Sequence, residues 1–316
     1  MSCKNKLIIL TGPTAVGKTA LSIQLAKRIG GEIVSADSMQ VYKYMDIGSA
    51  KIEKEEMGGI SHHLIDILDP GDEFHVFRFQ EMAKEAMAGI YARGHVPIIV
   101  GGTGLYIQAL LYDISFGQEE DHSAIREKLE MAAREKGSAF LHACLKKVDP
   151  ESAKIIHPNN QKRIIRALEF YQLSKTPISE HNKREREKEA AYDFCYFVLN
   201  DDRNLLYRKI DRRVDNMLEK GLVEEVRKLK EMGFSKDMVS MQGLGYKEIF
   251  SYLDGACTLD EAVYLIKRDT RHFAKRQLTW FRRERDVVWI EKQAFSYDED
   301  KILACMMEHF DRLQKK

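Results

Sequence analysis

One glycine-rich segment near the N-terminus constrains the fold of this chain more than any other feature. Residues 12–19 read Gly-Pro-Thr-Ala-Val-Gly-Lys-Thr and match the pattern G-x-x-x-x-G-K-[ST] at every fixed position. The continuous apolar run Leu7–Leu10 precedes this segment, and residues 19–29 follow it at helical spacing. Strand, glycine turn and helix are the context in which this pattern surrounds phosphate groups, which argues against a simple turn with an accidental lysine.

The residue types of this segment suit a polyphosphate or diphosphate ligand. Glycine lets the backbone curl so that successive N–H groups converge on phosphate oxygens, and the start of the helix adds a positive dipole end. Lys18 is placed to reach the terminal phosphate, and the hydroxyl of Thr19 is suited to hold Mg²⁺. We therefore predict a diphosphate-binding set of Gly12, Pro13, Thr14, Ala15, Val16, Gly17, Lys18 and Thr19, with Thr19 as the metal-holding residue.

Further short apolar runs extend the pattern into a sheet. Residues 32–36 and 96–100 are typical of buried strands, and Phe77–Arg93 has the spacing of a helix closed by Gly94. The order strand, helix, strand, helix, strand predicts an α/β fold with a doubly wound parallel sheet, like that of P-loop NTPases. Ligands of such sheets bind at the carboxyl ends of the strands.

The character of the chain changes between residues 116 and 190. This stretch shows only helical patterns rich in Glu, Lys and Arg, and a strand pattern resumes at Phe194–Leu199. Later patterns predict helices at about 203–219, 221–232, 245–253 and 258–285, and a strand at 287–290. We therefore predict one α/β core, residues 1–115 and 191–316, split by an all-helical insertion domain at 116–190.

Composition excludes several classes of protein. The 316 residues carry 50 Lys+Arg against 49 Asp+Glu, a net charge of +1, and 44% are hydrophobic, which excludes wholesale disorder and a tail-like polycation. No run approaches the roughly 18 apolar residues of a membrane span, and no signal-peptide pattern opens the chain. The cysteines are few, scattered and odd in number, which predicts a reducing, cytoplasmic location and no cysteine-based zinc site: Cys3, Cys144, Cys195, Cys257 and Cys305.

Two further segments fall at the predicted ligand edge of the sheet. Asp37 follows the second strand, where a carboxylate could act as a general base or hold a metal through water; the alternative is a helix N-cap. Gly101-Gly102-Thr103 follows the third strand, where an NTPase would commonly carry an aspartate. Glycines permit close approach of a ligand, and Thr103 could donate a hydrogen bond to an anion. This departure weakens an ordinary ATPase or GTPase interpretation.

These three segments together resemble the tRNA dimethylallyltransferase (isopentenyltransferase) family. The resemblance continues, in order, over nearly the whole chain, in residues 161–169, 213–217, 221–226, 242–248 and 270–280. The C-terminal zinc-finger extension of eukaryotic members is absent from this sequence, so we expect a bacterial-type member.

The resemblance implies a reaction. A dimethylallyl group would pass from dimethylallyl diphosphate to N6 of the tRNA adenosine immediately 3′ of the anticodon. Asp37 would take the N6 proton, while Lys18, Mg²⁺ on Thr19 and a donor such as Thr103 would neutralise the departing diphosphate. The family also has an arginine facing the diphosphate, and both Arg208 and Arg213 lie in the matching region, so this choice stays open.

The resemblance also implies tRNA contacts around an extruded target base. They fall in two segments: Asp37, Ser38, Met39 and Gln40, and Gln161, Lys162, Arg163, Ile164, Ile165 and Arg166. The alternative for the second segment is a solvated helix with Ile164, Ile165 and Leu168 as its core stripe. In the basic stretch at 258–285, Arg268, Arg271 and Lys275 share one helical face, which we expect to bind phosphates rather than only solvent.

Three function classes remain open on the residues alone. They are a tRNA prenyltransferase, a P-loop small-molecule kinase that uses ATP, and a non-catalytic, nucleotide-gated RNA-binding protein. Thr103 after two glycines, in place of a strand-ending aspartate, is the feature that separates them. We favour the prenyltransferase, with Mg²⁺ as cofactor, the tRNA anticodon stem-loop and dimethylallyl diphosphate as partners, no membrane, and a monomeric state. His62-His63 lacks a spaced third ligand and is expected to be structural or adjacent to the substrate.

Overall fold

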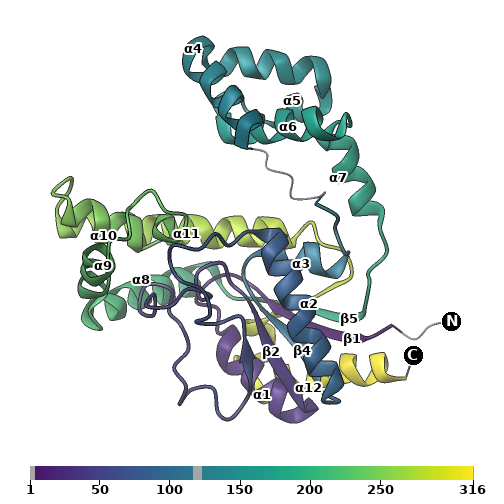
Figure 1. The fold of residues 1–316 in the computed structure, drawn as a ribbon. Helices are drawn as coiled ribbons and strands as arrows, with labels where there is room; N and C mark the ends of the chain where they lie inside the picture. The colour runs from purple at the N-terminus through teal and green to yellow at the C-terminus, as the bar shows by residue number, and fades with distance from the viewer. Residues whose placement is uncertain (1–3, 117–122, 316) are drawn as a thin grey trace. The chain divides into compact units, whose positions relative to one another are not determined.

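A computed structural model describes residues 4–116 and 123–315 of the chain. A six-stranded sheet forms the centre, with the strand order β3-β2-β4-β1-β5-β6 and parallel pairing throughout (Figure 1). The strands are β1 Lys6–Thr11, β2 Gly31–Ala36, β3 His62–His63, β4 Val96–Gly101, β5 Asp193–Asn200 and β6 Val287–Glu291. The predicted doubly wound parallel sheet is confirmed.

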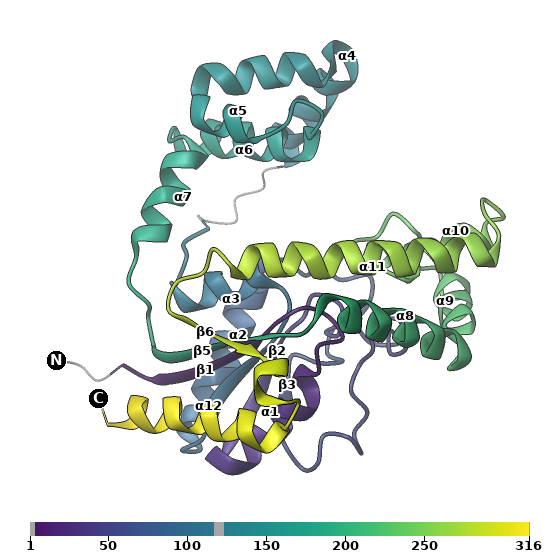
Figure 2. The ribbon, with the colours of Figure 1, turned by 180° about the vertical axis from the view of Figure 1, so that it is seen from behind.

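Helices cover both faces of this sheet. Helices α1 and α12 pack together on one face, and α2 and α3 pack together on the other (Figures 1 and 2). The helices of this α/β unit are α1 Lys18–Ile29, α2 Val76–Ala92, α3 Gly104–Leu111, α8 Arg203–Glu219, α9 Leu222–Glu231, α10 Tyr246–Leu253, α11 Leu259–Phe281 and α12 Glu299–Gln314, with short 3₁₀ turns η1 Ser240–Gln242 and η2 Lys292–Phe295.

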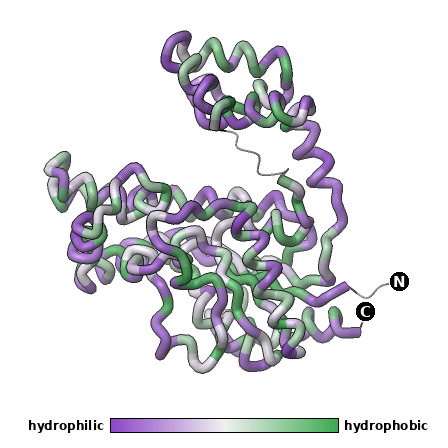
Figure 3. Tube along the Cα trace, viewed as in Figure 1, coloured by the Kyte–Doolittle hydropathy of each residue, from purple (hydrophilic) through white to green (hydrophobic). Residues whose placement is uncertain are grey.

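The central strands are hydrophobic because both of their faces are covered. Leu7, Ile8, Ile9 and Leu10 of β1 are all 0% exposed, and Figure 3 shows hydrophobic residues gathered on the strands of this unit. Burial of both faces explains why these strands read as continuous apolar runs instead of alternating patterns. The strand order places the carboxyl end of β1 between those of β4 and β5, beside the residues predicted to bind phosphate.

The contacts divide the chain into two compact units, one of residues 1–111 and 191–316 and one of residues 112–190. The sequence places the first boundary four residues later, at 115–116. The second unit contains α4 Ser123–Val148, α5 Pro150–Ile155, α6 Gln161–Ser174 and α7 Ile178–Glu187, and α4 is broken at Gly137, whose φ is 82°. Its core is separate and is built around Leu141, Leu145 and Ile164.

A buried carboxylate ties two helices of the second unit together. Asp149 is 1% exposed and accepts hydrogen bonds from the backbone and hydroxyl groups of Ser152 and Ser179 at 2.6–3.0 Å. Burial tends to raise the pKa of Asp149, but these bonds outweigh it and hold the pKa below its usual value. The start of α5 is therefore fixed to the start of α7.

Several elements differ from the sequence-based prediction. Helix α12, capped by Asp298, was not predicted, although Ile302, Met306 and Phe310 form its buried stripe. Strand β3 has only two residues, too few for a recognisable pattern. Helix α11 ends at Phe281, four residues before the predicted end. Within the described residues no helix has both the length and the hydropathy to cross a bilayer. The described cysteines, all but Cys3, are free thiols.

A cluster of charged and histidine side chains surrounds one buried carboxylate at the amino end of β2. The Glu32 carboxylate receives two hydrogen bonds from Arg93, at 2.8 Å each, and one each from His63 and His95, at 2.7 Å. The bonds to Arg93 contribute most to a lowered pKa of Glu32, burial opposes them, and the histidines add to them, so that the pKa is about 2. His63 of the predicted structural pair therefore holds β3 against β2.

This depressed pKa predicts a pH dependence of stability. The folded state holds the Glu32 proton more weakly than the unfolded chain, so the stabilisation is complete above about pH 4.5 and is lost as the pH falls towards 2. In urea titrations, Glu32→Gln should give a shallower fall of unfolding free energy across this window, by up to about 1.4 kcal/mol per pH unit. Glu308→Gln, in an exposed pair with Arg312, should retain the wild-type slope. Equal slopes for Glu32→Gln and wild type would contradict this account.

Candidate active site

The phosphate loop is curled by three residues with positive φ. Gly12, Ala15 and Gly17 have φ values of 145°, 63° and 98°. A Cβ at Gly12 would lie 2.4 Å from the Leu199 carbonyl oxygen, so the loop approaches β5 too closely for any side chain. The Lys18 ammonium donates to the carbonyls of Gly12 at 3.0 Å and Pro13 at 2.9 Å, and the loop thus wraps around it.

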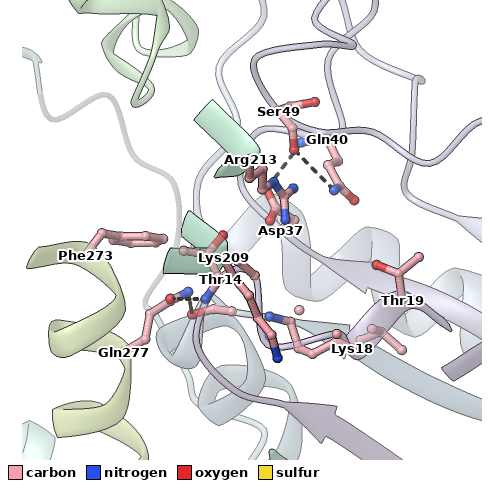
Figure 4. Close-up of a pocket in the computed structure, with 15 residues that line it drawn as sticks. Thr14, Lys18, Thr19, Asp37, Gln40, Ser49, Lys209, Arg213, Phe273 and Gln277 are labelled. Carbon is pink, nitrogen blue, oxygen red and sulfur yellow. Dashed lines mark hydrogen bonds between the residues drawn. The ribbon is translucent and has the colours of Figure 1, made fainter. Parts of the chain in front are cut away.

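A cavity of about 350 Å³ opens on this loop. Figure 4 shows Asp37 and Arg213 beside each other in the cavity, with Phe273 and Gln277 entering from α11. Burial, and then the charge of Arg213, lower the pKa of Lys18 to about 8, and the Asp37 carboxylate partly opposes them. The predicted loop residues that line the cavity are Thr14, Ala15, Gly17, Lys18 and Thr19.

Asp37 holds a turn rather than a helix. Its Oδ1 accepts hydrogen bonds from the backbone of Met39 at 2.8 Å and Gln40 at 3.3 Å, and no helix begins there. The N-cap alternative is therefore wrong for this residue. Within the described residues Oδ2 has no hydrogen-bond partner, so one oxygen of a positioned carboxylate is left for chemistry.

A second, more apolar cavity of about 440 Å³ adjoins the first. Its lining includes Met39, Phe74, Tyr106, Met217 and Ile266, and also Ser38, Thr103 and Thr270. Both cavities share Thr14, Asp37, Ser49, Gly102, Arg213, Phe273 and Gln277. A polar, cationic compartment thus meets an apolar one, and the carboxylate of Asp37 lies at their junction.

Gln277 connects the two glycine-rich turns and was missed by the sequence analysis. Its Oε1 accepts from the backbone of Thr14 at 2.9 Å, and its Nε2 donates to the carbonyl of Gly102 at 3.0 Å. A Cβ at Gly102 would lie 2.1 Å from this Nε2, which explains the glycine before Thr103. Thr103 is anchored separately, because its backbone donates to Ala36 at the end of β2. No local pattern in the sequence links residues this far apart.

The structure distinguishes the two candidate arginines by position. Arg213 of α8 lines both cavities, whereas Arg208, on the same helix, is exposed and lines neither. Burial lowers the pKa of the Arg213 guanidinium, and the charge of the Asp37 carboxylate in the same cavity opposes this shift. Lys209 also lines the first cavity and pairs with Asp201.

The loop after Asp37 is held by a carboxylate that the sequence analysis also missed. Glu225 accepts from the backbone of Asp46, Ile47 and Gly48 at 2.7–3.0 Å, and from the Tyr246 hydroxyl at 2.8 Å. Burial, and the neighbouring Glu225, raise the pKa of Tyr246 and keep this hydroxyl a donor. In the same loop Gln40, predicted to contact tRNA, donates to the carbonyls of residues 49 and 50.

The predicted tRNA-contacting side chains differ in accessibility. Ile164 and Ile165 are 0% and 4% exposed in the core of the helical unit, so they form the core stripe and their side chains are not available to a nucleic acid. Lys162, Arg163 and Arg166 are exposed, and Gln161 is half-buried. On α11, Arg268 pairs with Asp269 at 2.8 Å, Arg271 pairs with Asp211 at 2.8 Å, and Lys275 is exposed.

The parallel sheet, the curled loop before α1 and the joined apolar cavity define a P-loop protein suited to a phosphorylated ligand with an apolar part. The family model described as IPP transferase matches residues 40–284, and that described as isopentenyl transferase matches residues 5–68. The chain belongs to the IPP transferase family.

Similar proteins cover nearly the whole chain. A tRNA dimethylallyltransferase of Lachnoclostridium phytofermentans is 59% identical over 92% of this chain and 93% of its own. The solved structure of a full-length tRNA isopentenylpyrophosphate transferase from Bacillus halodurans is 43% identical, with a TM-score of 0.74 over 99% of each chain. The structure of a eukaryotic dimethylallyltransferase acting on tRNA is 31% identical, with a TM-score of 0.76 over 91% of this chain and 74% of that one.

The bridge made by Gln277 predicts a measurable loss on its removal. Gln277→Leu leaves the Thr14 N–H and the Gly102 carbonyl without their partner, which should lower the unfolding free energy by about 1–3 kcal/mol in urea titrations. Gln293→Leu, at an exposed glutamine of η2, serves as a control and should change stability by less than about 0.5 kcal/mol. A Gln277→Leu protein as stable as wild type would show that the bridge does not hold the two turns.

Proposed function

We propose that this chain transfers a dimethylallyl group from dimethylallyl diphosphate to N6 of the adenosine 3′-adjacent to the anticodon of tRNA, and releases diphosphate. The observation that carries the proposal is that a cationic cavity on the phosphate loop joins a more apolar cavity at Asp37. Membership of the IPP transferase family and the names of the similar proteins support it. The same family membership, and Thr103 in place of a strand-ending aspartate, favour it over the kinase alternative.

The residues at the junction account for the bonds that change. The bond between adenine N6 and C1 of the dimethylallyl group forms as the bond between C1 and the diphosphate oxygen breaks. The electron pair of the broken bond therefore leaves on that oxygen. Asp37 takes the N6 proton, because N6 is a weak nucleophile until it loses that proton. Lys18, the loop N–H groups and Arg213 stabilise the charge that grows on the diphosphate, and Thr103 is a further donor.

The donor set suits Mg²⁺. Thr19 presents a hydroxyl at the first cavity, and Asp37 lies across it. Among the described residues there is no cluster of three or more His, Cys, Asp or Glu side chains, so the protein would supply few ligands and the diphosphate oxygens the others, as is usual for this ion. When bound, Mg²⁺ supplies charge neutralisation for the leaving diphosphate.

For tRNA, we propose contacts by three sets of side chains. Ser38 and Met39 line the apolar cavity, where an extruded base would enter, and Lys162, Arg163 and Arg166 are exposed cations of the helical insertion domain. The face of α11 with Arg268, Arg271 and Lys275 would bind phosphates, with the first two exchanging their present aspartate partners. We further propose that the enzyme is a monomer and works in the cytoplasm, where tRNA is found.

A direct assay of transfer tests this function and the role of Asp37. Wild-type protein with Mg²⁺, labelled dimethylallyl diphosphate and an unmodified anticodon stem-loop should place label on the target adenosine. Asp37→Ala should reduce turnover by about 10²–10⁴-fold, because the proton then lacks its acceptor, while filter binding of the stem-loop is retained.

Asp69→Ala, in an exposed acidic loop, should leave turnover unchanged. No label transfer by the folded wild-type protein would contradict the proposed function. Near wild-type turnover of Asp37→Ala would leave the function standing and would contradict the general-base role.

The basic face of α11 makes a separate prediction. Changing Arg268, Arg271 and Lys275 together to Ala should weaken tRNA binding and flatten the plot of log K against log salt by a slope of about 2, since three phosphate contacts are lost. The matched control changes three exposed cations on α1 and α12 to Ala: Arg28, Lys301 and Arg312. Each of them is also ion-paired, and this variant should keep the wild-type slope. An unchanged slope in the α11 variant would show that this face is solvated and does not bind phosphates.

A further inference from the structure

A second, buried lysine contacts the phosphate loop. Lys292 begins η2, directly after β6, and is only 9% exposed. Its ammonium donates to the carbonyl oxygen of Val16 at 3.3 Å and would lie 3.2 Å from a Cβ placed on Gly17. Lys18 holds the carbonyls of Gly12 and Pro13, so two lysines bind three carbonyls of one eight-residue loop.

Lys292 has no acidic partner among the described residues. The carboxylate next to it in the chain, Glu291, is engaged by the side-chain amide of Asn200 at 3.0 and 3.1 Å. A buried ammonium with one carbonyl and no counter-charge is costly, because the carbonyl replaces only part of the lost hydration. Such a group lowers the free energy of unfolding unless a nearby anion offsets its charge when the ligand is bound.

We propose that Lys292 is a positioning residue of the diphosphate site and that its counter-charge is the diphosphate bound on the other side of the phosphate loop. The proposal rests on the proposed function, in which the loop binds diphosphate. Lys292 acts in two ways. Its hydrogen bond turns the Val16 carbonyl away from the anion, and its ammonium places a positive charge 3.3 Å from the Val16 oxygen of the loop. Both effects strengthen with the charge on the ligand, and neither requires Lys292 to touch it.

A buried lysine that served only to hold the fold would behave differently from one that serves the anion. Lys292→Met keeps the length of the side chain and removes its charge, whereas Lys292→Arg keeps the charge. If the anion is the counter-charge, the methionine variant should bind inorganic pyrophosphate with Mg²⁺ about tenfold more weakly by calorimetry, and the arginine variant should stay within about twofold of wild type. Without pyrophosphate the methionine variant should be at least as stable as wild type.

Unchanged pyrophosphate affinity of Lys292→Met, or an equal loss in Lys292→Met and Lys292→Arg, would overturn the inference; Lys292→Gln gives the same comparison if the methionine variant does not fold. Lys301→Met, a 67%-exposed lysine of α12, is the matched control and should bind as wild type does. If wild-type protein itself fails to bind pyrophosphate, the proposed diphosphate site fails, and the inference fails with it.

Discussion

The site depends on the way the phosphate loop closes around the Lys18 ammonium. Among the described residues this cation has only the carbonyls of Gly12 and Pro13 as hydrogen-bond partners, and burial together with Arg213 lowers its pKa to about 8. Lys18 and Arg213 face one carboxylate, Asp37, in the same cavity, so the described residues leave this compartment short of negative charge. A bound polyanion would supply the missing negative charge, so the proposed diphosphate site is compatible with a nearly neutral total charge of the chain.

The rest of the α/β unit places two compartments on either side of Asp37. Parallel strands bring the ends of β1, β2 and β4 to one edge, and Gln277 sets the spacing of the two glycine turns there. Glu225 and Tyr246 fix the loop that follows Asp37. In the proposed reaction the diphosphate would occupy the polar cavity, and the prenyl group and the extruded base would occupy the adjoining, more apolar one.

The sequence predicted the parts of this site that are contiguous in the chain, because the constraint on them is local. The phosphate loop, Asp37 and Thr103 each follow a short apolar strand, and the sheet rule places all three at one edge. Gln277, Glu225 and Lys292 were not predicted, since each acts on a segment more than 170 residues away and no periodicity signals that contact. The resemblance implied tRNA contacts for Ile164 and Ile165, but both side chains are buried. Their apolar spacing, which predicted a core stripe, was the better guide. The choice between Arg208 and Arg213 needed the helix to be placed on the cavity.

The central claim is that diphosphate, prenyl carbon and N6 meet at Asp37. Its most direct test is a crystal structure of this protein with Mg²⁺, an anticodon stem-loop and dimethylallyl S-thiolodiphosphate, which resists transfer. We predict both phosphates within hydrogen-bond distance of the Gly12–Thr19 loop and Lys18, with C1 between them and an extruded adenine whose N6 contacts Asp37. A diphosphate bound outside this loop, or an adenine whose N6 lies away from Asp37, would contradict the account.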